Sequence, residues 1–119
     1  MAKALLLIDH GSVRKESNVL LEHVASMIQT MRPDLLVHVA HMEIAEPTIA
    51  QGFEQCVQSG ATEIIVFPYM LAQGRHACWD IPRFVDEVAK KYSDVVVHVT
   101  EPLGLHEKIA QVVLERASL

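Results

Sequence analysis

The sequence is short of several residue types and patterns that mark special classes of protein. It has five glycines and five prolines in 119 residues, which is too few for a fibrous or disordered chain. No hydrophobic run approaches the roughly 20 residues that a membrane-spanning helix needs. The apolar stretch at 4–8 is too short, and enters a predicted strand too directly, to be a signal peptide. The two cysteines, Cys56 and Cys78, lack CxxC spacing, so we expect reduced thiols in a cytoplasmic protein.

Positive charge is also scarce. Ten lysines and arginines face 15 acidic residues, which leaves a formal net charge of -5. A nucleic-acid partner usually requires a basic face, so this balance argues against one. Half of the residues are hydrophobic, and 119 residues suffice for one core and no more. We therefore expect one globular domain over residues 1–119, with no nucleic-acid or membrane partner.

Apolar runs alternate with helical patterns along the whole chain. Runs that read as buried strands occupy residues 4–9, 35–41, 63–67 and 95–99. Hydrophobic residues at helical spacing follow each run, at residues 20–31, from Pro47 to 57, at 81–88 and at 105–113. This βαβαβαβα order predicts an α/β fold with a single four-stranded parallel sheet that helices cover on both faces.

Two histidines and two carboxylates are expected at one edge of that sheet. Parallel strands place all their carboxyl ends on the same edge, where ligands bind in open α/β sheets. The segments that follow the strands are 9–12, 41–43, 68–76 and 100–102, and they contain His10, Glu43, His76 and Glu101. Imidazole and carboxylate together suit divalent iron, cobalt, nickel or zinc. The alternative is that these histidines only hydrogen-bond their own loops, and spacing alone does not separate the two interpretations.

Other residues near this edge have weaker signals. Arg14 and Lys15 lie at the start of the first helix, and with Arg75 they would attract an anionic ligand, unless they are simply solvated. Tyr69 and Trp79 flank His76 and would wall an apolar planar ligand, unless they only pack. We interpret His23, His38, His98 and His106 as structural or solvated residues. His41 is intermediate, because it shares a face with Glu43 if the second strand continues that far.

Two other functional classes fit poorly. A receiver domain needs clustered acidic residues after the first strand, whereas His10 follows Asp9 here and the third strand ends in Pro68. A dinucleotide-binding module needs a GxGxxG turn, which HGSVRKES at residues 10–17 lacks.

Four segments together resemble the small sirohydrochlorin chelatases, the short class II cobalto-, ferro- and nickelochelatases. They cover the chain in the family's order and read LLLIDHGSVRKESN (5–18), MEIAEPTI (42–49), VFPYMLAQGRHACWDIP (66–82) and EPLG (101–104). The resemblance implies a chelatase-like fold with the macrocycle in a cleft at the strand ends. It also implies a homodimer, because long members carry two such domains in one chain.

The resemblance assigns roles to particular residues. His10 in HGS and His76 in GRH would bind the incoming ion and supply a proton acceptor, and Glu43 would be the third polar group facing the metal. Ser12, Arg14 and Arg75 would contact the substrate's peripheral carboxylates. The divalent ion, Co²⁺, Fe²⁺ or Ni²⁺, would be a substrate, and no permanently bound cofactor is implied. The sequence departs from the family at Val13 and at Ala77-Cys78-Trp79, but not at the two histidines.

The resemblance predicts insertion of cobalt or iron, with nickel as a further candidate, into sirohydrochlorin for cobalamin or siroheme synthesis. The physiological metal, the pathway and the residue that accepts the protons stay open. A non-catalytic carrier of metal or tetrapyrrole is the alternative, since the same histidines would serve it.

Overall fold

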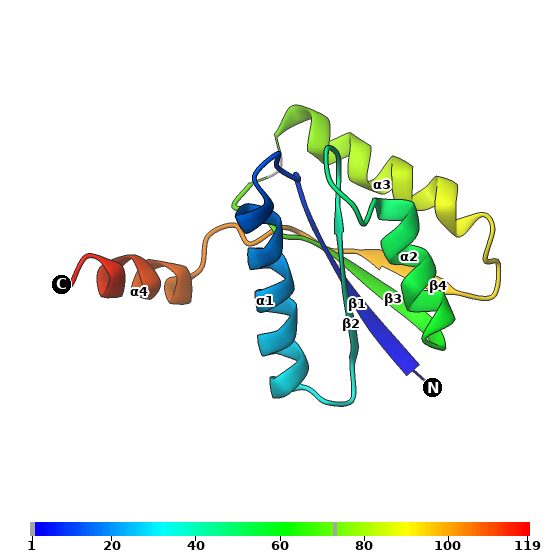
Figure 1. Cartoon of the computed structure of the whole chain (residues 1–119), viewed down its shortest axis with the longest axis horizontal. Coiled ribbons are helices and arrows are strands. Elements are labelled where there is room, and N and C mark those ends of the chain that lie inside the picture. The colour runs from blue at the N-terminus through cyan, green and yellow to red at the C-terminus, as the bar shows by residue number, and fades with distance from the viewer. Residues whose placement is uncertain (1, 73) are drawn as a thin grey trace.

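Four strands and four helices alternate along the chain, as the hydrophobic pattern predicts (Figure 1). The computed structural model describes residues 2–72 and 74–119, without the side chains of residues 75–78. The elements are β1 (Ala2–Asp9), α1 (Lys15–Met31), β2 (Leu36–His41), α2 (Ile49–Gln58), β3 (Ala61–Pro68), α3 (Arg75–Ala89), β4 (Val96–Val99) and α4 (Glu107–Arg116). No helix within the described residues is both long and apolar enough to cross a membrane.

The strands form one parallel sheet in the order β2-β1-β3-β4. The two central strands are hydrophobic on both faces, because helices pack on each side of them. Leu6 and Ile8 of β1 belong to the core on one face, and Leu7 belongs to the core on the other. This explains why β1 reads as an unbroken apolar run rather than as an alternating one.

Helices cover the two faces unequally (Figure 1). α2 packs on β1, β2 and β3, and α3 packs against α2 on the same face, where Phe53 and Ile81 are fully buried. α1 alone covers the opposite face, where it contacts β2 and β1 and buries Leu21 and Ala25. The prediction of a sheet with helices on both faces is therefore confirmed, with α1 lying mainly over β2 and β1 and reaching Phe67 of β3.

The last helix does not pack on the sheet. α4 buries none of its residues and extends away from the rest of the chain, on the side of the sheet where α1 lies (Figure 1). The radius of gyration is 14.6 Å, whereas a compact domain of this length has about 13.5 Å. The expected helix at 105–113 exists, but it begins at Glu107, and of its large apolar side chains only Ile109 is half-buried.

Helix starts differ from the sequence-based expectation at two further places. Pro47 does not open the second helix, because Thr48 caps it: the Thr48 hydroxyl accepts from the Gln51 amide, and the Gln51 side chain accepts from the Thr48 amide. This reciprocal pair fixes the first helical residue at Ile49. The loop expected at 69–76 is shorter, because α3 begins at Arg75 directly after Gly74.

Candidate functional site at the strand carboxyl ends

The carboxyl ends of β1 and β3 lie side by side at the centre of the sheet. The connection from β1 leads outward to β2 on one side, and β3 and β4 lie on the other. The order of the strands therefore changes direction between β1 and β3, and ligands of open α/β sheets bind in the crevice at such a point. His10 follows β1, and the segment that leads to α3 follows β3.

The turn that carries His10 is held by Asp9 and Gly11. An Asp9 carboxylate oxygen accepts a hydrogen bond from the Gly11 amide at 3.0 Å. Gly11 has a φ of +89°, which residues with a Cβ rarely adopt, and a Cβ there would overlap the carbonyl oxygen of Glu43. Glycine is therefore required both by the backbone conformation and by the close approach of the next loop.

Backbone hydrogen bonds join the His10 turn to the segment after β2. The Met42 amide donates to the Asp9 carbonyl at 2.8 Å, and the Glu43 amide donates to the His10 carbonyl at 3.1 Å. These bonds extend the β1–β2 pairing past the end of the strands. They place His10 and Glu43 next to each other with both side chains exposed at the strand edge. Ile44 follows with a φ of 75°, a conformation that a β-branched residue avoids unless its surroundings impose it.

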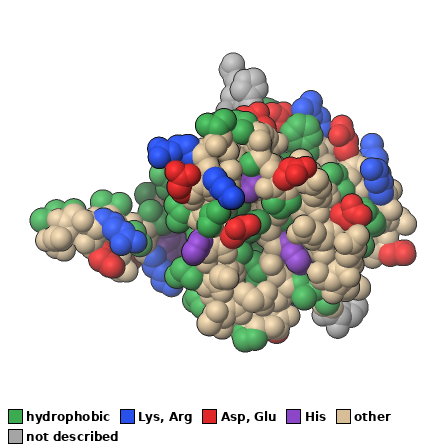
Figure 2. Space-filling model, in the orientation of Figure 1, with side chains coloured by type: hydrophobic (Ala, Val, Ile, Leu, Met, Phe, Trp, Pro, Cys, Tyr) green, Lys and Arg blue, Asp and Glu red, His purple; other side chains and the backbone are tan. Residues whose placement is uncertain are grey.

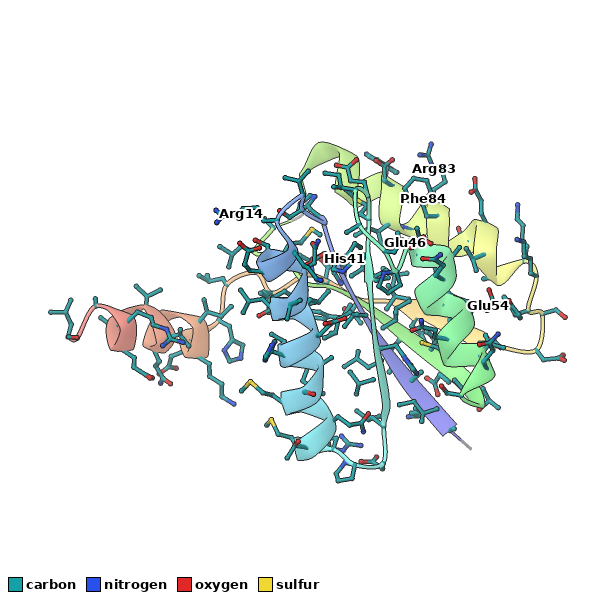
Figure 3. All side chains as sticks on the ribbon, viewed as in Figure 1. Arg14, His41, Glu46, Glu54, Arg83 and Phe84 are labelled. Atoms are coloured by element: carbon teal, nitrogen blue, oxygen red, sulfur yellow. The ribbon has the colours of Figure 1, made fainter. Side chains whose placement is uncertain are left out.

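A buried pair of side chains, Asp9 and His41, holds this turn from the interior of the protein. His41 Nδ1 lies 2.5 Å from Asp9 Oδ1, the oxygen that also accepts from Gly11, and only 2% of His41 is exposed. Figure 3 shows His41 in the interior near the strand ends. Asp9 and His41 are paired in register as the last residues of β1 and β2, so their side chains share one face. The sequence shows both residues at strand ends, but the register that joins them is not visible in it.

β2 ends at His41, so Glu43 lies in the following turn and not on the strand. The two residues consequently do not share a strand face. His41 points into the protein and bonds Asp9, whereas Glu43 is exposed beside His10.

Ser12 and Arg14 lie between the His10 turn and α1. The Ser12 hydroxyl accepts from the Arg14 amide at 3.0 Å, and the Asn18 side chain bonds both the amide and the carbonyl of Ser12. Arg14 precedes α1 as its N-cap, with its side chain 74% exposed and 3.5 Å from the Glu16 carboxylate. Figure 3 shows Arg14 pointing away from the body of the protein. The segment is therefore rigid in its backbone while its one cation faces solvent.

Arg75 and His76 occupy the first turn of α3, not a loop. Their side chains, and that of Cys78, lie outside the described part of the structure. Among the side chains that are described, no three from His, Cys, Asp and Glu are grouped so as to hold a metal ion. The structure thus joins the backbones of His10 and Glu43, while His76 lies in the first turn of α3, the helix that follows the neighbouring strand β3.

Cys56, the cysteine whose side chain the structure describes, does not lie at this edge of the sheet. Cys56 is fully buried on the inner face of α2, and this burial raises the pKa of its thiol to about 12. Buried structural cysteines of this kind are inert.

The hollow beside the site is small. A pocket of about 240 Å³ lies between Asp9, Tyr69 and the inner side of α1, where Leu20 and Val24 line it. Sites that enclose a drug-sized ligand measure roughly 300–1,000 Å³. A large planar ligand would consequently lie across the open edge of the sheet and not inside this pocket.

Comparison with known proteins places the chain in a family. The CbiX family model matches residues 4–118. The chloroplastic sirohydrochlorin ferrochelatase of Arabidopsis thaliana is 41% identical over 97% of this chain and 51% of its own length. The sirohydrochlorin cobaltochelatase of Sulfolobus acidocaldarius is 33% identical over 95% of this chain and 88% of its own.

The fold of this chain is also similar to that of solved chelatase structures. The sirohydrochlorin chelatase of Bacillus subtilis subspecies spizizenii, solved in complex with cobalt, has a TM-score of 0.90 and 30% identity; the match covers 99% of this chain and 50% of that one. The chain thus spans about half the length of the first curated relatives that it matches, and nearly all of the shorter ones. With a family match over nearly all its residues and the chelatase fold around the His10 turn, the chain belongs to the CbiX family.

Proposed function

We propose that this chain inserts a divalent metal ion, cobalt or iron, into sirohydrochlorin, acting as one chelatase-like unit over residues 1–119. The observation that carries the proposal is the hydrogen bond from the Glu43 amide to the His10 carbonyl, which joins the backbones of these two residues at the ends of β1 and β2. The names of the relatives, both ferrochelatases and cobaltochelatases of sirohydrochlorin, support the same reaction.

Metal insertion requires groups that bind the ion and groups that accept protons. Two pyrrole N–H protons must leave as the ring nitrogens replace the ion's other ligands. His10 and His76 are the proposed ligands, and one of them would also serve as a general base, a role that histidine fills most often in enzymes. Glu43, exposed beside His10, would complete the ligand set or accept the second proton.

The buried Asp9–His41 pair would position these groups. Asp9 accepts from both the Gly11 amide and the His41 ring, and these bonds fix the turn on which His10 stands. Such supporting hydrogen bonds keep ligands oriented, and their loss lowers metal affinity or activity.

The substrate's carboxylates would meet the start of α1. Arg14 faces solvent there, with the Ser12 hydroxyl next to it, and Arg75 would approach from the start of α3. These cations matter because the net charge of -5 otherwise opposes a polyanionic substrate. Nickel stays a further candidate metal, since nitrogen and oxygen sites bind nickel at least as tightly as cobalt and iron.

We also infer a homodimer, for which the shorter span of this chain relative to its long relatives is the support. A cytoplasmic location is supported by the free thiol of Cys56. The ion would be a substrate, in keeping with the relatives that were solved with cobalt and with Fe³⁺.

The test is absorbance-monitored insertion of cobalt, iron and nickel into sirohydrochlorin. We expect multiple turnovers by the wild type, and a loss of about 100-fold or more in His10→Ala and in His76→Ala, as for removal of an acid–base group. His23→Ala is the matched control, because His23 is exposed on α1 away from the strand ends. Turnover that survives in both variants would support the chelatase reaction but refute the assignment of His10 and His76 to its site.

The same assay separates an enzyme from a carrier. A carrier binds metal or tetrapyrrole without releasing metallated product, so its signal stops at one equivalent per chain. Absence of acceleration over the protein-free reaction with every metal would refute the chelatase proposal and favour the carrier.

A further inference from the structure

One side chain of α1 holds both backbone groups of Ser12. The carboxamide oxygen of Asn18 accepts a hydrogen bond from the Ser12 amide at 3.0 Å, and its nitrogen donates to the Ser12 carbonyl at 2.8 Å. A side-chain amide has both an acceptor and donors, so it can pair with a backbone as a neighbouring strand does. Asn18 is half-buried and therefore ties the segment after His10 to the body of the protein.

Asn18 serves this segment and not its own helix. Asparagine is a poor residue inside a helix, because its side chain competes for nearby backbone groups. The Asn18 side chain does not cap α1, whose N-cap is Arg14 and has no side-chain capping bond. Its two hydrogen bonds go instead to Ser12, outside the helix. The residue is thus placed where its bonds to a loop compensate for its low helix propensity.

The segment 12–14 has little other support. Val13 is 87% exposed, and the Arg14 side chain is 74% exposed. Figure 2 shows basic and acidic side chains protruding together beside the start of α1, where Figure 3 labels Arg14. Within the part of the chain that the structure describes, the Ser12 backbone has hydrogen bonds with Asn18 alone. The position of Ser12 consequently depends on Asn18.

The preceding turn, which carries His10, is held by a different set of bonds. The Gly11 amide donates to Asp9, and the Glu43 amide donates to the His10 carbonyl. None of these bonds involves Asn18. Removal of the Asn18 side chain should therefore release the backbone of Ser12 while the His10 turn keeps its own supports.

The other end of α1 carries a second clamp of the same chemistry. The Gln29 side chain donates to the Leu35 carbonyl and accepts from the Val37 amide at 3.2 Å. Val37 lies at the amino end of β2, whereas Ser12 follows the carboxyl end of β1. The same helix thus holds one backbone segment beside the candidate site and another at the far edge of the sheet.

We propose that Asn18 is a positioning residue for tetrapyrrole binding. By fixing the Ser12 backbone, it holds the Ser12 hydroxyl and the start of the Arg14 side chain where the substrate's peripheral carboxylates arrive. The Arg14 amide, which donates to the Ser12 hydroxyl at 3.0 Å, links the two residues. A segment that is already ordered loses less conformational freedom when a ligand binds. The inference rests on the proposed function, in which Ser12 and Arg14 contact the substrate.

The test is the kinetics of metal insertion, with sirohydrochlorin and cobalt varied separately. We expect Asn18→Ala to raise the KM for sirohydrochlorin about tenfold, the effect of a misplaced hydrogen bond to a charged group. Both kcat and the KM for cobalt should stay within about twofold of the wild type, because the lost contact stabilises the ground state and the transition state equally.

Gln29→Ala is the matched control. It removes the same kind of clamp from the same helix, so it should lower the urea midpoint of unfolding about as much as Asn18→Ala. Both of its KM values should equal those of the wild type, because Gln29 lies far from the strand carboxyl ends. A purely structural role for Asn18 would instead make the kinetics of the two variants alike.

A double-mutant cycle shows whether Asn18 acts through Arg14. If it does, Asn18→Ala should raise the KM for sirohydrochlorin much less in an Arg14→Gln background than in the wild type, since coupled residues are not additive. Asn18→Asp is a second variant, which serves if the alanine variant does not fold. It keeps an acceptor for the Ser12 amide but has no donor for the Ser12 carbonyl, so it should also raise this KM.

The outcomes separate this proposal from the proposed function. A KM for sirohydrochlorin that is unchanged in the Asn18 variants, or that rises equally in Gln29→Ala, would overturn the role of Asn18 while wild-type turnover upholds the chelatase. Absence of wild-type turnover would refute the chelatase, and fluorescence titration with sirohydrochlorin alone would then test Asn18. Binding about tenfold weaker in Asn18→Ala would support the positioning role. Equal binding, or no binding by the wild type, would overturn it.

Discussion

Single residues at the end of β1 hold the candidate site in place. Asp9, Gly11 and His41 are linked through one carboxylate oxygen, and Gly11 allows the segment carrying Glu43 to approach. None of the three is an expected metal ligand, yet the position of His10 depends on them. The chemistry of this edge consequently rests on residues whose role is to support the backbone.

Alanine substitutions at Gly11 and Gly60 separate two costs of a side chain at Gly11: the clash with the Glu43 carbonyl and the strain of a positive φ. Gly60 has a similar φ, +97° against +89° for Gly11, but a Cβ at Gly60 meets no atom within 4 Å. We expect Gly60→Ala to lower the free energy of unfolding by about 1–2 kcal/mol, the cost of the left-handed conformation. Gly11→Ala should cost clearly more, since the Glu43 carbonyl must also move. Urea unfolding measures both, and equal losses would contradict the close approach of the two loops.

Replacement of Asp9 by alanine tests the buried pair. The substitution leaves the buried His41 ring and the Gly11 amide without their shared acceptor, so we expect a loss of about 1–3 kcal/mol in the free energy of unfolding. Asp94→Ala is the matched control, because Asp94 is exposed and should be close to neutral. The prediction would be wrong if the two variants unfolded at the same urea concentration.

At the level of elements, short local signals set where helices begin. Thr48 and Gln51 form a capping box that starts α2 two residues after Pro47, so local hydrogen bonds and not the proline fix the boundary. α1 begins at Lys15 without a side-chain cap, directly after Arg14. The start of α2 matters for the site because the loop that ends there carries Glu43.

Removal of the α2 cap should destabilise the chain by a predictable amount. Thr48→Ala loses the hydroxyl that accepts from the Gln51 amide, and such losses cost about 1 kcal/mol. Thr48→Ser keeps a hydroxyl and should retain most of the stability. Thermal and urea unfolding of the two variants test this, and a serine variant as unstable as the alanine variant would argue against capping as the cause.

In the whole molecule, the sheet and three helices form the packed body while α4 stands apart (Figure 1). The hydrophobic clusters lie between α1, α2, α3 and the sheet, and no residue of α4 belongs to them. The packed body therefore contains the strand-end site, and α4 adds no buried residue to it.

A variant that ends at residue 104 tests this division. Because α4 buries nothing in its own chain, we expect the shortened protein to unfold cooperatively and to keep the circular dichroism of the remaining three helices. A shortened protein that unfolds without a cooperative transition, or that loses helix beyond α4, would contradict this division.

Hydrophobic periodicity was enough to predict the α/β class, the order of the elements and the placement of His10 and Glu43 at one edge. These properties depend on local pattern and on the rule that parallel strands end at a common edge. The resemblance in four segments was enough for the family, which the match over residues 4–118 confirms. The structure changed where helices begin, at Ile49, Arg75 and Glu107, but not their number or order.

Only the tertiary structure decided which residues touch. The Asp9–His41 pair depends on strand register, and the meeting of Gly11 with Glu43 depends on two loops 32 residues apart packing together. The direction of α4 likewise depends on hydrogen bonds between its connector and residues 70–71. A residue's local pattern determines the element it joins, but contacts between distant segments arise only when the sheet is assembled, so no single stretch of sequence contains them.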